Sequence, residues 1–360
     1  MRDNQAILKH GGRLNEAVKK YAIEKDAWLD LSTGINPNSW PVPDIPAEIY
    51  RRLPETDDGL LEAAQSYYQV QHLLAVSGSQ VAIQLLPEIF QRYGLIANNP
   101  TIGIISPCYG EHEYQWQKQK CVIKHLTSVM VQESIDQLDV LILVNPNNPS
   151  GEILAAETVL AWQQQLKKKQ GFIIIDEAFM DSTGELSILP HINSNNTILD
   201  NLIVLRSVGK FFGLAGVRCG FVIASARILA LLEYHQGPWS VSGPARWIVK
   251  KALSDKNWIK ENSQYLEIQS QQLEAMLAKF FNRLDETSTI SGTHLFKTVC
   301  LEAAACLYQE LAQRGVLVRL LDNEKGLRFG LPGTKKQWQQ LAKVLDTITV
   351  NESTYSVASS

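Results

Sequence analysis

One stretch of the chain, from Ser207 to Gly220, combines residue types that could do chemistry. Lys210 has a hydroxyl residue, Ser207, three positions before it and Arg218 eight positions after it, and four glycines occur within the stretch. Glycines let a backbone approach a ligand, while a hydroxyl and a guanidinium offer contacts to an oxyanion. The pattern suits a reactive amine beside a bound phosphate, although a solvated loop lysine explains the spacing equally well.

Two simpler phosphate motifs do not fit this stretch. A P-loop requires Ser or Thr directly after its lysine, and here the next residue is Phe211. The glycines at 213, 216 and 220 are spaced wrongly for the dinucleotide-binding fingerprint. The chemistry of Lys210 therefore has to be read from its surroundings.

Apolar segments alternate with helical patterns through the first two thirds of the chain. Strands are predicted at residues 73–76, 101–106, 122–126, 140–144, 172–175, 202–205 and 221–224. The runs Val140–Val144 and Phe172–Ile175 are continuously aliphatic or aromatic, as strands buried on both faces require. The alternation predicts an α/β fold in which helices cover a mostly parallel sheet.

Polar residues stand at the carboxyl ends of these predicted strands, where parallel sheets collect their ligands. The candidates along the chain are Gly78 and Ser79, Tyr109, Asn148, Asp176, and Ser207 with Lys210. They supply phosphate-binding amides at a helix start, an aromatic plate, an amide, an acid and an amine.

Each candidate also has an ordinary explanation. Tyr109 could simply pack, Asp176 could cap a helix or bind a metal, and the segment Asn145–Asn148 could form a turn. Asp176 follows apolar residues, so it should be partly buried and must find a cationic or hydrogen-bonding partner. A planar phosphorylated aldehyde with a protonated ring nitrogen would explain all of these strand ends together.

With these residues at its strand ends, the chain resembles the fold-type I pyridoxal-phosphate (PLP) enzymes, in the branch of histidinol-phosphate aminotransferases and threonine-phosphate decarboxylases. The resemblance covers almost the whole chain, and its most specific parts are Ser207–Gly220, Asn145–Gly151 and Asp176–Phe179. It implies a large PLP-binding domain with a mostly parallel seven-stranded sheet and a smaller α+β domain. It also implies a homodimer.

The resemblance assigns roles to the residues at the strand ends. Lys210 would be the Schiff-base lysine, Asp176 would pair with the pyridine nitrogen, and Tyr109 would stack on the ring. Asn148 would reach the phenolate oxygen of the ring. The cofactor phosphate would be held by Gly78, Ser79, Ser207 and Arg218.

On the substrate side, Arg328 matches the family's carboxylate-binding arginine. Further candidates for substrate binding are His10, Gly34, Asn36, Asn148 and Arg319. A substrate phosphate needs several donors, which suits this set.

Two departures from the aminotransferase pattern point to a branch within the family. Phe179 and Leu53 stand where many aminotransferases carry tyrosines that contact the cofactor. The opening His10-Gly11-Gly12-Arg13 looks like that of the cobalamin-pathway threonine-phosphate decarboxylases. We therefore expect PLP-dependent decarboxylation of L-threonine O-3-phosphate to (R)-1-amino-2-propanol O-2-phosphate. The alternatives are a histidinol-phosphate-type aminotransferase and, less favoured, a regulator that retains an aminotransferase-like domain.

Composition limits the other classes of function. The chain has 360 residues, 45% of them hydrophobic and 20% charged, and a formal net charge of −3, which disfavours a nucleic-acid partner. Its five cysteines are scattered, which argues against a disulfide framework or a structural zinc site. With no long apolar run and no secretory segment, we expect a cytoplasmic enzyme away from membranes.

The order of the patterns predicts the domain boundaries. Residues 1–45 would form an N-terminal arm and part of the small domain, and residues 46–240 the large domain. Residues 241–350 would form the small C-terminal domain, and 351–360 a polar tail.

Overall fold

The computed structural model describes residues 11–192, 199–283 and 288–348 of the chain. These residues fold into two compact units. The large unit comprises Ser39–Asn148 and Glu152–Ser263; the small unit comprises the chain up to Asn38, Pro149–Gly151, and the chain from Gln264 onward. His10 and the predicted polar tail at 351–360 lie outside the described residues.

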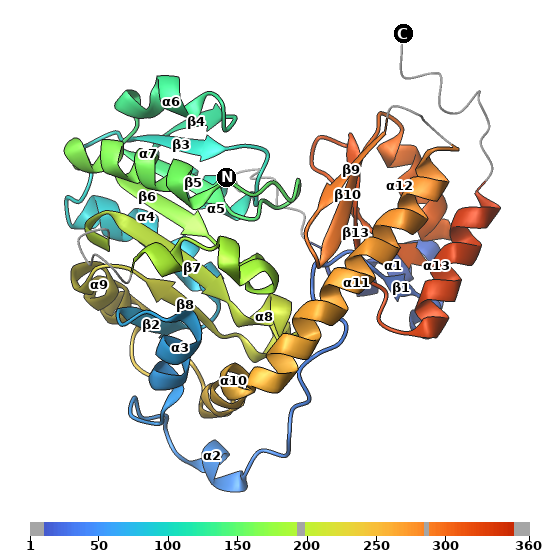
Figure 1. The fold of residues 1–360 in the computed structure, drawn as a ribbon, viewed down its shortest axis with the longest axis horizontal. Helices are drawn as coiled ribbons and strands as arrows, with labels where there is room; N and C mark the ends of the chain where they lie inside the picture. Colours follow the sequence, from blue (N-terminus) through green and yellow to red (C-terminus); the bar gives the residue numbers. More distant parts are fainter. Residues whose placement is uncertain (1–10, 193–198, 284–287, 349–360) are drawn as a thin grey trace, which may run out of the picture. The chain divides into compact units, whose positions relative to one another are not determined.

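The large unit is built on a 7-stranded sheet with the order β2-β8-β7-β6-β5-β3-β4 in the described part of the chain (Figure 1). The strands are β2 Leu73–Val76, β3 Thr101–Ile105, β4 Val122–Leu126, β5 Val140–Val144, β6 Phe172–Asp176, β7 Leu202–Ser207 and β8 Gly220–Ile223. Neighbouring strands are parallel except where β8 runs antiparallel to β7 and to β2. The expected mostly parallel seven-stranded sheet is confirmed.

Helices cover the faces of this sheet. Those of the large unit are α2 Ala47–Arg51, α3 Leu60–Tyr68, α4 Ser79–Arg92, α5 Glu111–Lys118, α6 Val131–Ser134, α7 Ala156–Lys168, α8 Val208–Phe211, α9 Ala226–Gln236 and α10 Gly243–Ser254. Apolar side chains of α4, α5 and α9 form one core cluster with alternate residues of β5, β6 and β7. These aliphatic strands are almost completely buried, as their sequences predict.

The alternation of side chains gives the two faces of β6 and β7 different residues. Ile174 and Leu205 belong to the core cluster under α4 and α5. Because side chains alternate along a strand, Asp176 and Ser207 share that face, whereas Arg206 takes the opposite one. The strand ends can therefore present polar groups on both sides of the sheet.

The small unit contains an antiparallel sheet with the order β12-β13-β10-β9 and a parallel pair, β1 with β11. Its strands are β1 Leu29–Asp30, β9 Thr289–Gly292, β10 Phe296–Cys300, β11 Val316–Leu317, β12 Arg319–Leu320 and β13 Gly326–Gly330. The short strands β11 and β12, one residue apart in the chain, thus belong to two different sheets. The α+β character of this unit is confirmed.

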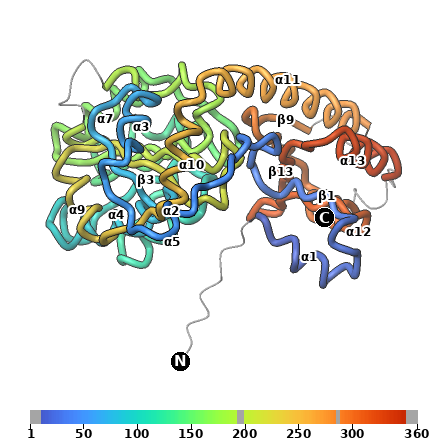
Figure 2. Tube along the Cα trace, turned by 90° about the horizontal axis from the view of Figure 1, so that it is seen from below, coloured from blue at the N-terminus to red at the C-terminus, as the bar shows by residue number. Residues whose placement is uncertain are grey.

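The helices of the small unit bring the two ends of the described chain together. They are α1 Leu14–Tyr21, α12 Ala304–Gln313, α13 Lys335–Thr347 and the larger part of α11 Lys256–Phe281. α1 packs against α12 (Figure 2), and the Tyr21 hydroxyl donates a hydrogen bond of 2.5 Å to Gln309 Oε1. Within the described residues, no helix is both long and apolar enough to span a membrane.

The domain boundaries stay a prediction, and the packing of α10 bears on the one near residue 240. The expected boundary near residue 240 assigned α10 to the small domain, but α10 packs against α3 of the large unit. Arg246 on α10 forms two hydrogen bonds to the carboxylate of Asp58, at 2.6 and 2.7 Å. This buried arginine and the apolar face around it hold α10 in the large unit, and the division falls within α11 instead.

Gly220 lies where β7, β8 and the start of α4 approach one another. It pairs with Ser207 on one side and with Val76 on the other. A Cβ atom on Gly220 would lie 2.6 Å from the carbonyl oxygen of Arg206 and 2.8 Å from the amide nitrogen of Ser79. Both are backbone atoms, so the close approach requires glycine.

We expect Gly220→Ala to destabilise the protein by about 1–3 kcal/mol, because overpacking against backbone atoms can be relieved only by moving strands. Gly216→Ala is the matched control, since a Cβ there would meet nothing within 4 Å. Thermal melting of both variants measures the difference. An unchanged melting temperature for Gly220→Ala would contradict the close packing at this position.

Candidate active site

Asp176 ends β6 as a buried acid, with only 3% of its surface exposed. Its Oδ1 accepts a hydrogen bond of 3.0 Å from the amide of Ala178, and its Oδ2 lies 3.0 Å from Nε2 of His112. Because an ionised carboxylate can only accept, the Nε2 atom donates in this contact. Asp176 is thus buried and has a hydrogen-bonding partner, as its sequence context predicts. Among the described residues, no group of three or more His, Cys, Asp or Glu side chains could hold a metal ion.

His112 is the partner of Asp176 that the sequence analysis did not identify. It lies in the first turn of α5, it is 2% exposed, and its ring meets that of Tyr109 edge-on at 6.2 Å. The sequence contained one indication of this role, because His112 follows the candidate Tyr109 by three residues after the same strand. Nothing in the sequence showed that α5 would direct this side chain at β6.

Tyr109 is half-buried at the start of the segment leading to α5. Its hydroxyl donates a hydrogen bond of 3.0 Å to Gln80 Oε1, and Gln80 Nε2 donates in turn to Glu111 Oε2 at 2.8 Å. Burial, and then the charges of Glu111 and Asp176, raise the pKa of Tyr109 well above its usual value. The phenol is therefore neutral at physiological pH, and its hydroxyl is fixed from the side of α4.

Gly78, Ser79 and Arg218 form a cradle at the start of α4. Gly78 has a φ of +82°, and a Cβ atom there would lie 2.7 Å from Nη2 of Arg218. Arg218 itself has a left-handed backbone and donates a hydrogen bond of 3.2 Å to the carbonyl oxygen of Ala215. The guanidinium thus lies against the glycine that precedes the first amide of α4, which is an arrangement suited to an anion.

Lys210 is carried by the short helix α8, which follows β7 directly. Ser207, the last residue of β7, precedes this helix, so the hydroxyl and the amine are separated by less than one helical turn. The Nζ atom of Lys210 lies 5.3 Å from the centre of the Phe179 ring. Phe179 is buried in the segment after Asp176, so its ring covers the lysine from the end of β6.

Asn148 is half-buried at the end of a loop that is fixed on both sides. Asn145 exchanges two hydrogen bonds with the backbone of Leu154, and Asn147 Nδ2 donates to the carbonyl oxygen of Pro107 at 2.9 Å. The next residues, Pro149–Gly151, belong to the small unit, where the Thr298 hydroxyl donates to the carbonyl oxygen of Pro149 at 2.6 Å. The turn explanation therefore holds for Asn145 and Asn147, whereas Asn148 stands at the point where the chain changes unit.

Arg319 and Arg328 stand opposite each other on β12 and β13 of the small unit. Arg328 is buried, its Nη2 donates to the carbonyl oxygen of Ser32 at 3.0 Å, and its guanidinium lies 5.0 Å from the centre of the Phe296 ring. Burial, and then the charge of Arg319, lower the pKa of Arg328 to about 10. Arg319 donates a hydrogen bond of 2.8 Å to Oδ1 of Asp322, so a carboxylate lies beside one of the two guanidinium groups.

The structure does not assign the remaining substrate candidates, Asn36, Gly34 and His10, to a binding site. Asn36 is buried, but its Oδ1 accepts a hydrogen bond of 2.9 Å from the amide of Asn38, which is ordinary turn chemistry. Gly34 is buried in the same segment. His10 lies outside the described residues, although Gly12 after it donates a backbone hydrogen bond of 2.8 Å to the Ser32 hydroxyl.

The side chains at the edge of the large sheet fit the parts of PLP. A buried carboxylate suits a protonated ring nitrogen, a half-buried phenol suits the ring face, and a lysine amine suits the aldehyde. The Gly78–Arg218 cradle suits the phosphate, because a side chain at residue 78 would fill it. These groups come from the ends of different strands that share one sheet edge.

Comparison with known proteins agrees with this chemistry. Residues 53–345 match the model of the family "Aminotransferase class I and II". The chain is 40% identical to a threonine-phosphate decarboxylase of Pseudomonas aeruginosa, over 94% of this chain and 97% of that protein. It is 36% identical to one from Sinorhizobium sp, over 94% and 98% of the two chains.

A solved structure shares the fold at lower sequence identity. The histidinol-phosphate aminotransferase of Sinorhizobium meliloti, determined in complex with pyridoxal-5'-phosphate, superposes with a TM-score of 0.77 and 17% identity. The match covers 96% of this chain and 97% of that one. Given the extent of the family match and the near full-length similarity to the Pseudomonas protein, this chain belongs to the aminotransferase class I and II family, whose members are PLP-dependent.

Proposed function

We propose that this chain is a PLP-dependent lyase that decarboxylates L-threonine O-3-phosphate and forms (R)-1-amino-2-propanol O-2-phosphate, as a step in cobalamin biosynthesis. The observation that carries the proposal is the cross-strand pair of Arg319 and Arg328. Two relatives named threonine-phosphate decarboxylase, at 40% and 36% identity over nearly the whole chain, support it.

The strand-end residues of the large unit are proposed to hold the cofactor. PLP, when bound, supplies an electron sink for breaking a bond at Cα of the amino acid. Asp176, fixed by His112, is suited to a protonated ring nitrogen, and Tyr109 offers its face to the ring. Gly78, Ser79, Ser207 and Arg218 are the proposed phosphate-binding residues, and Asn148 is the proposed donor to the ring oxygen.

Lys210 is proposed to act both as the residue that binds the aldehyde and as a proton donor. Its amine lies 5.3 Å from the centre of the Phe179 ring, at the end of β6. An amine held in this way can return a proton to Cα after carbon dioxide leaves. Phe179 carries no hydroxyl, so it makes no contact of the kind a tyrosine would provide there.

The arginine pair matches the charges of the proposed substrate. Threonine phosphate carries a carboxylate and a phosphate, so neighbouring guanidinium groups can bind both or share one. We propose that Arg328 binds the carboxylate and Arg319 the phosphate, with His10, Gly34, Asn36 and Asn148 as further candidates. Orientation of the carboxylate then determines which Cα bond breaks, and errors of ~1 Å in such positioning are costly to the rate.

The second candidate function is a histidinol-phosphate-type aminotransferase. It is favoured by the shared fold with the Sinorhizobium meliloti enzyme. Histidinol phosphate has a phosphate but no carboxylate. In such an enzyme, Arg328 would therefore bind the carboxylate of the second substrate instead. Lys210, at the centre of the site, disfavours a regulator without catalytic activity.

We also propose that the chain works as a homodimer in the cytoplasm. The dimer is inferred from resemblance to the family. The cytoplasmic location is supported by the free thiols of the five cysteines, which suit a reducing compartment. Light scattering of the purified protein and fractionation of cells measure the two properties.

The product formed from threonine phosphate tests the function. We expect carbon dioxide and aminopropanol phosphate to appear without 2-oxoglutarate, and Lys210→Ala to abolish the turnover. Histidinol phosphate with 2-oxoglutarate is the matched control reaction. Amino transfer in that reaction, without decarboxylation of threonine phosphate, would reject the decarboxylase in favour of the aminotransferase.

We expect His112→Leu to lower the rate and the PLP affinity by roughly 5- to 150-fold, because a buried carboxylate left without its partner loses about 1–3 kcal/mol. Steady-state rates and PLP titration measure both effects. His125→Leu is the control, since His125 lies on the edge strand β4 with 56% of its side chain exposed. Equal rates and equal PLP affinities in His112→Leu and His125→Leu would contradict the role assigned to His112.

We expect Arg319→Gln to raise KM for threonine phosphate by roughly 10- to 150-fold, the loss associated with a charged hydrogen bond of about 1.5–3 kcal/mol. PLP affinity should stay unchanged, because Arg319 belongs to the small unit. Arg314→Gln is the control: Arg314 is bonded to Glu310 within α12 and its neighbouring turn. A KM that stays the same in Arg319→Gln would count against phosphate binding at this pair.

A further inference from the structure

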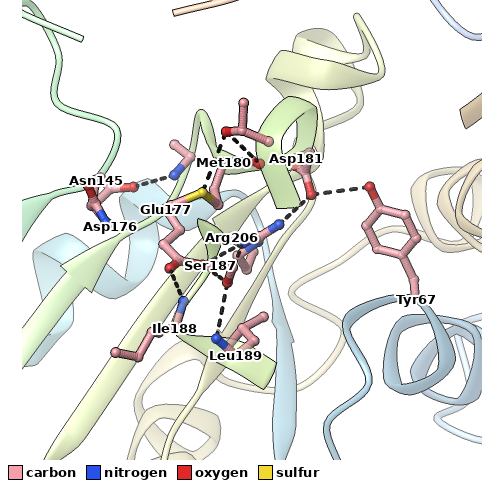
Figure 3. A network of polar contacts seen from close by, with 12 residues as sticks. Tyr67, Asn145, Asp176, Glu177, Met180, Asp181, Ser187, Ile188, Leu189 and Arg206 are labelled. Carbon is pink, nitrogen blue, oxygen red and sulfur yellow. Dashed lines mark hydrogen bonds and ion pairs between the residues drawn. The ribbon is translucent and has the colours of Figure 1, made fainter. Parts of the chain in front are cut away.

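Arg206 and Glu177 lie next in sequence to two proposed site residues but on the other face of the sheet. Arg206 precedes Ser207 at the end of β7, and Glu177 follows Asp176 at the end of β6. Figure 3 shows Glu177 and Arg206 pointing toward each other, away from the Asp176 side chain. The proposed cofactor site has thus a second set of polar residues directly behind it.

Arg206 bridges two buried carboxylates. Its Nη1 donates to Glu177 Oε2 at 2.5 Å, and its Nη2 donates to Asp181 Oδ1 at 2.6 Å. The side chains of all three residues are at most 3% exposed. Asp181 belongs to the 3₁₀ segment Met180–Leu186, so the guanidinium joins two strand ends and the segment that follows β6.

Further hydrogen bonds fix the two carboxylates. Glu177 accepts from the Ser187 hydroxyl at 2.6 Å and from the amide of Ile188 at 3.0 Å (Figure 3). The Tyr67 hydroxyl of α3 donates to Asp181 Oδ1 at 3.3 Å. We call Arg206, Glu177, Asp181 and Ser187 the rear cluster.

The rear cluster requires a permanent cation at its centre. Burial acts to lower the pKa of Arg206, but the charges of Asp181 and Glu177 raise it well above its usual value. Glu177 and Asp181 share this single guanidinium, whose planar fork reaches both. A lysine has one compact charge and cannot make both contacts in the same way.

The backbone of the rear cluster is also the backbone of the proposed site. The Glu177 amide donates to the carbonyl oxygen of Leu205 at 2.9 Å, which continues the pairing of β6 and β7 past Asp176. The carbonyl oxygen of Arg206 and the amide of Ser79 both lie where a Cβ atom on Gly220 would meet them, at 2.6 and 2.8 Å. A displacement of Arg206 would therefore also displace Asp176, the helix α8 that carries Lys210, and the cradle at the start of α4.

We propose that Arg206 is a positioning residue, which fixes the strand ends bearing Asp176 and Ser207–Lys210 from the opposite face of the sheet. In this role it determines the cofactor affinity and the surroundings of the lysine. The inference rests on the proposed placement of PLP in the large unit, and on neither the substrate nor the reaction.

A role in folding alone makes a different prediction. Buried ion pairs can often be replaced with little effect on stability, provided that no charge is left without a partner. If Arg206 only stabilised the fold, its substitution would lower the melting temperature and leave the properties of bound PLP unchanged. Positioning predicts that the cofactor is affected in protein that is still folded.

The experiment compares Arg206→Lys with Arg246→Lys. Arg246 is also a buried arginine of the large unit with two hydrogen bonds to one carboxylate, that of Asp58. Three properties are measured for each: melting of the PLP-free protein, the dissociation constant for PLP, and the pH at which the visible absorbance of bound PLP changes. The substrate is absent throughout.

We expect Arg206→Lys to weaken PLP binding by about 10- to 100-fold, the range found for substitutions of the residues that orient the ligands of a bound metal. The midpoint of the absorbance change should move by at least ~0.5 pH unit, since the proton affinity of a bound group depends on the charges and dipoles around it. Arg246→Lys should lower the melting temperature and change neither cofactor property. If Arg206→Lys does not fold, Glu177→Gln, which keeps the shape of the cluster, is measured instead.

Unchanged PLP affinity and an unchanged midpoint in the folded Arg206→Lys or Glu177→Gln protein would overturn the inference. An equal shift in Arg246→Lys would do the same, because it would show a general effect of buried arginines. Failure of the unsubstituted protein to bind PLP is a separate result, which would reject the proposed cofactor site itself.

Discussion

The alignment of β5, β6 and β7 is the constraint on which the large unit depends. Val144, Asp176 and Leu205 stand side by side across these three parallel strands. The strands are buried on both faces, so their register is fixed by packing along their whole length. The loops that leave this edge therefore start from fixed points. The packing of the strands thus determines where the segments that carry Lys210 and Asn148 begin.

The two units handle charge in different ways. In the large unit, the buried acids Asp176 and Glu177 each have a basic side chain beside them, His112 and Arg206 respectively. In the small unit, the neighbours Arg319 and Arg328 carry the same charge. Arg319 also donates a hydrogen bond of 2.8 Å to Oδ1 of Asp322, so an acid lies beside one of the two guanidinium groups.

The sequence predicted most strands and the acid, amide and lysine at their ends, because aliphatic runs and their polar termini are local signals. It did not predict the contacts of His112 or Arg206, because these depend on which way a helix or a strand face points. The boundary near residue 240 stays a prediction; α10 has the same polar character as α11, and only the packing of α10 on α3 separates the two helices. The roles of the site residues remain predictions.

The consecutive acids Asp176 and Glu177 carry a consequence for how this protein tolerates insertions. Their side chains face opposite sides of the sheet, one toward His112 and the other toward Arg206. One extra residue within β6 would exchange the faces, because it would put Ile175 where Asp176 stands and Asp176 where Glu177 stands. Composition and charge would be almost unchanged, yet both clusters would lose their geometry. A deletion scan through β6 should therefore find no tolerated length other than the natural one.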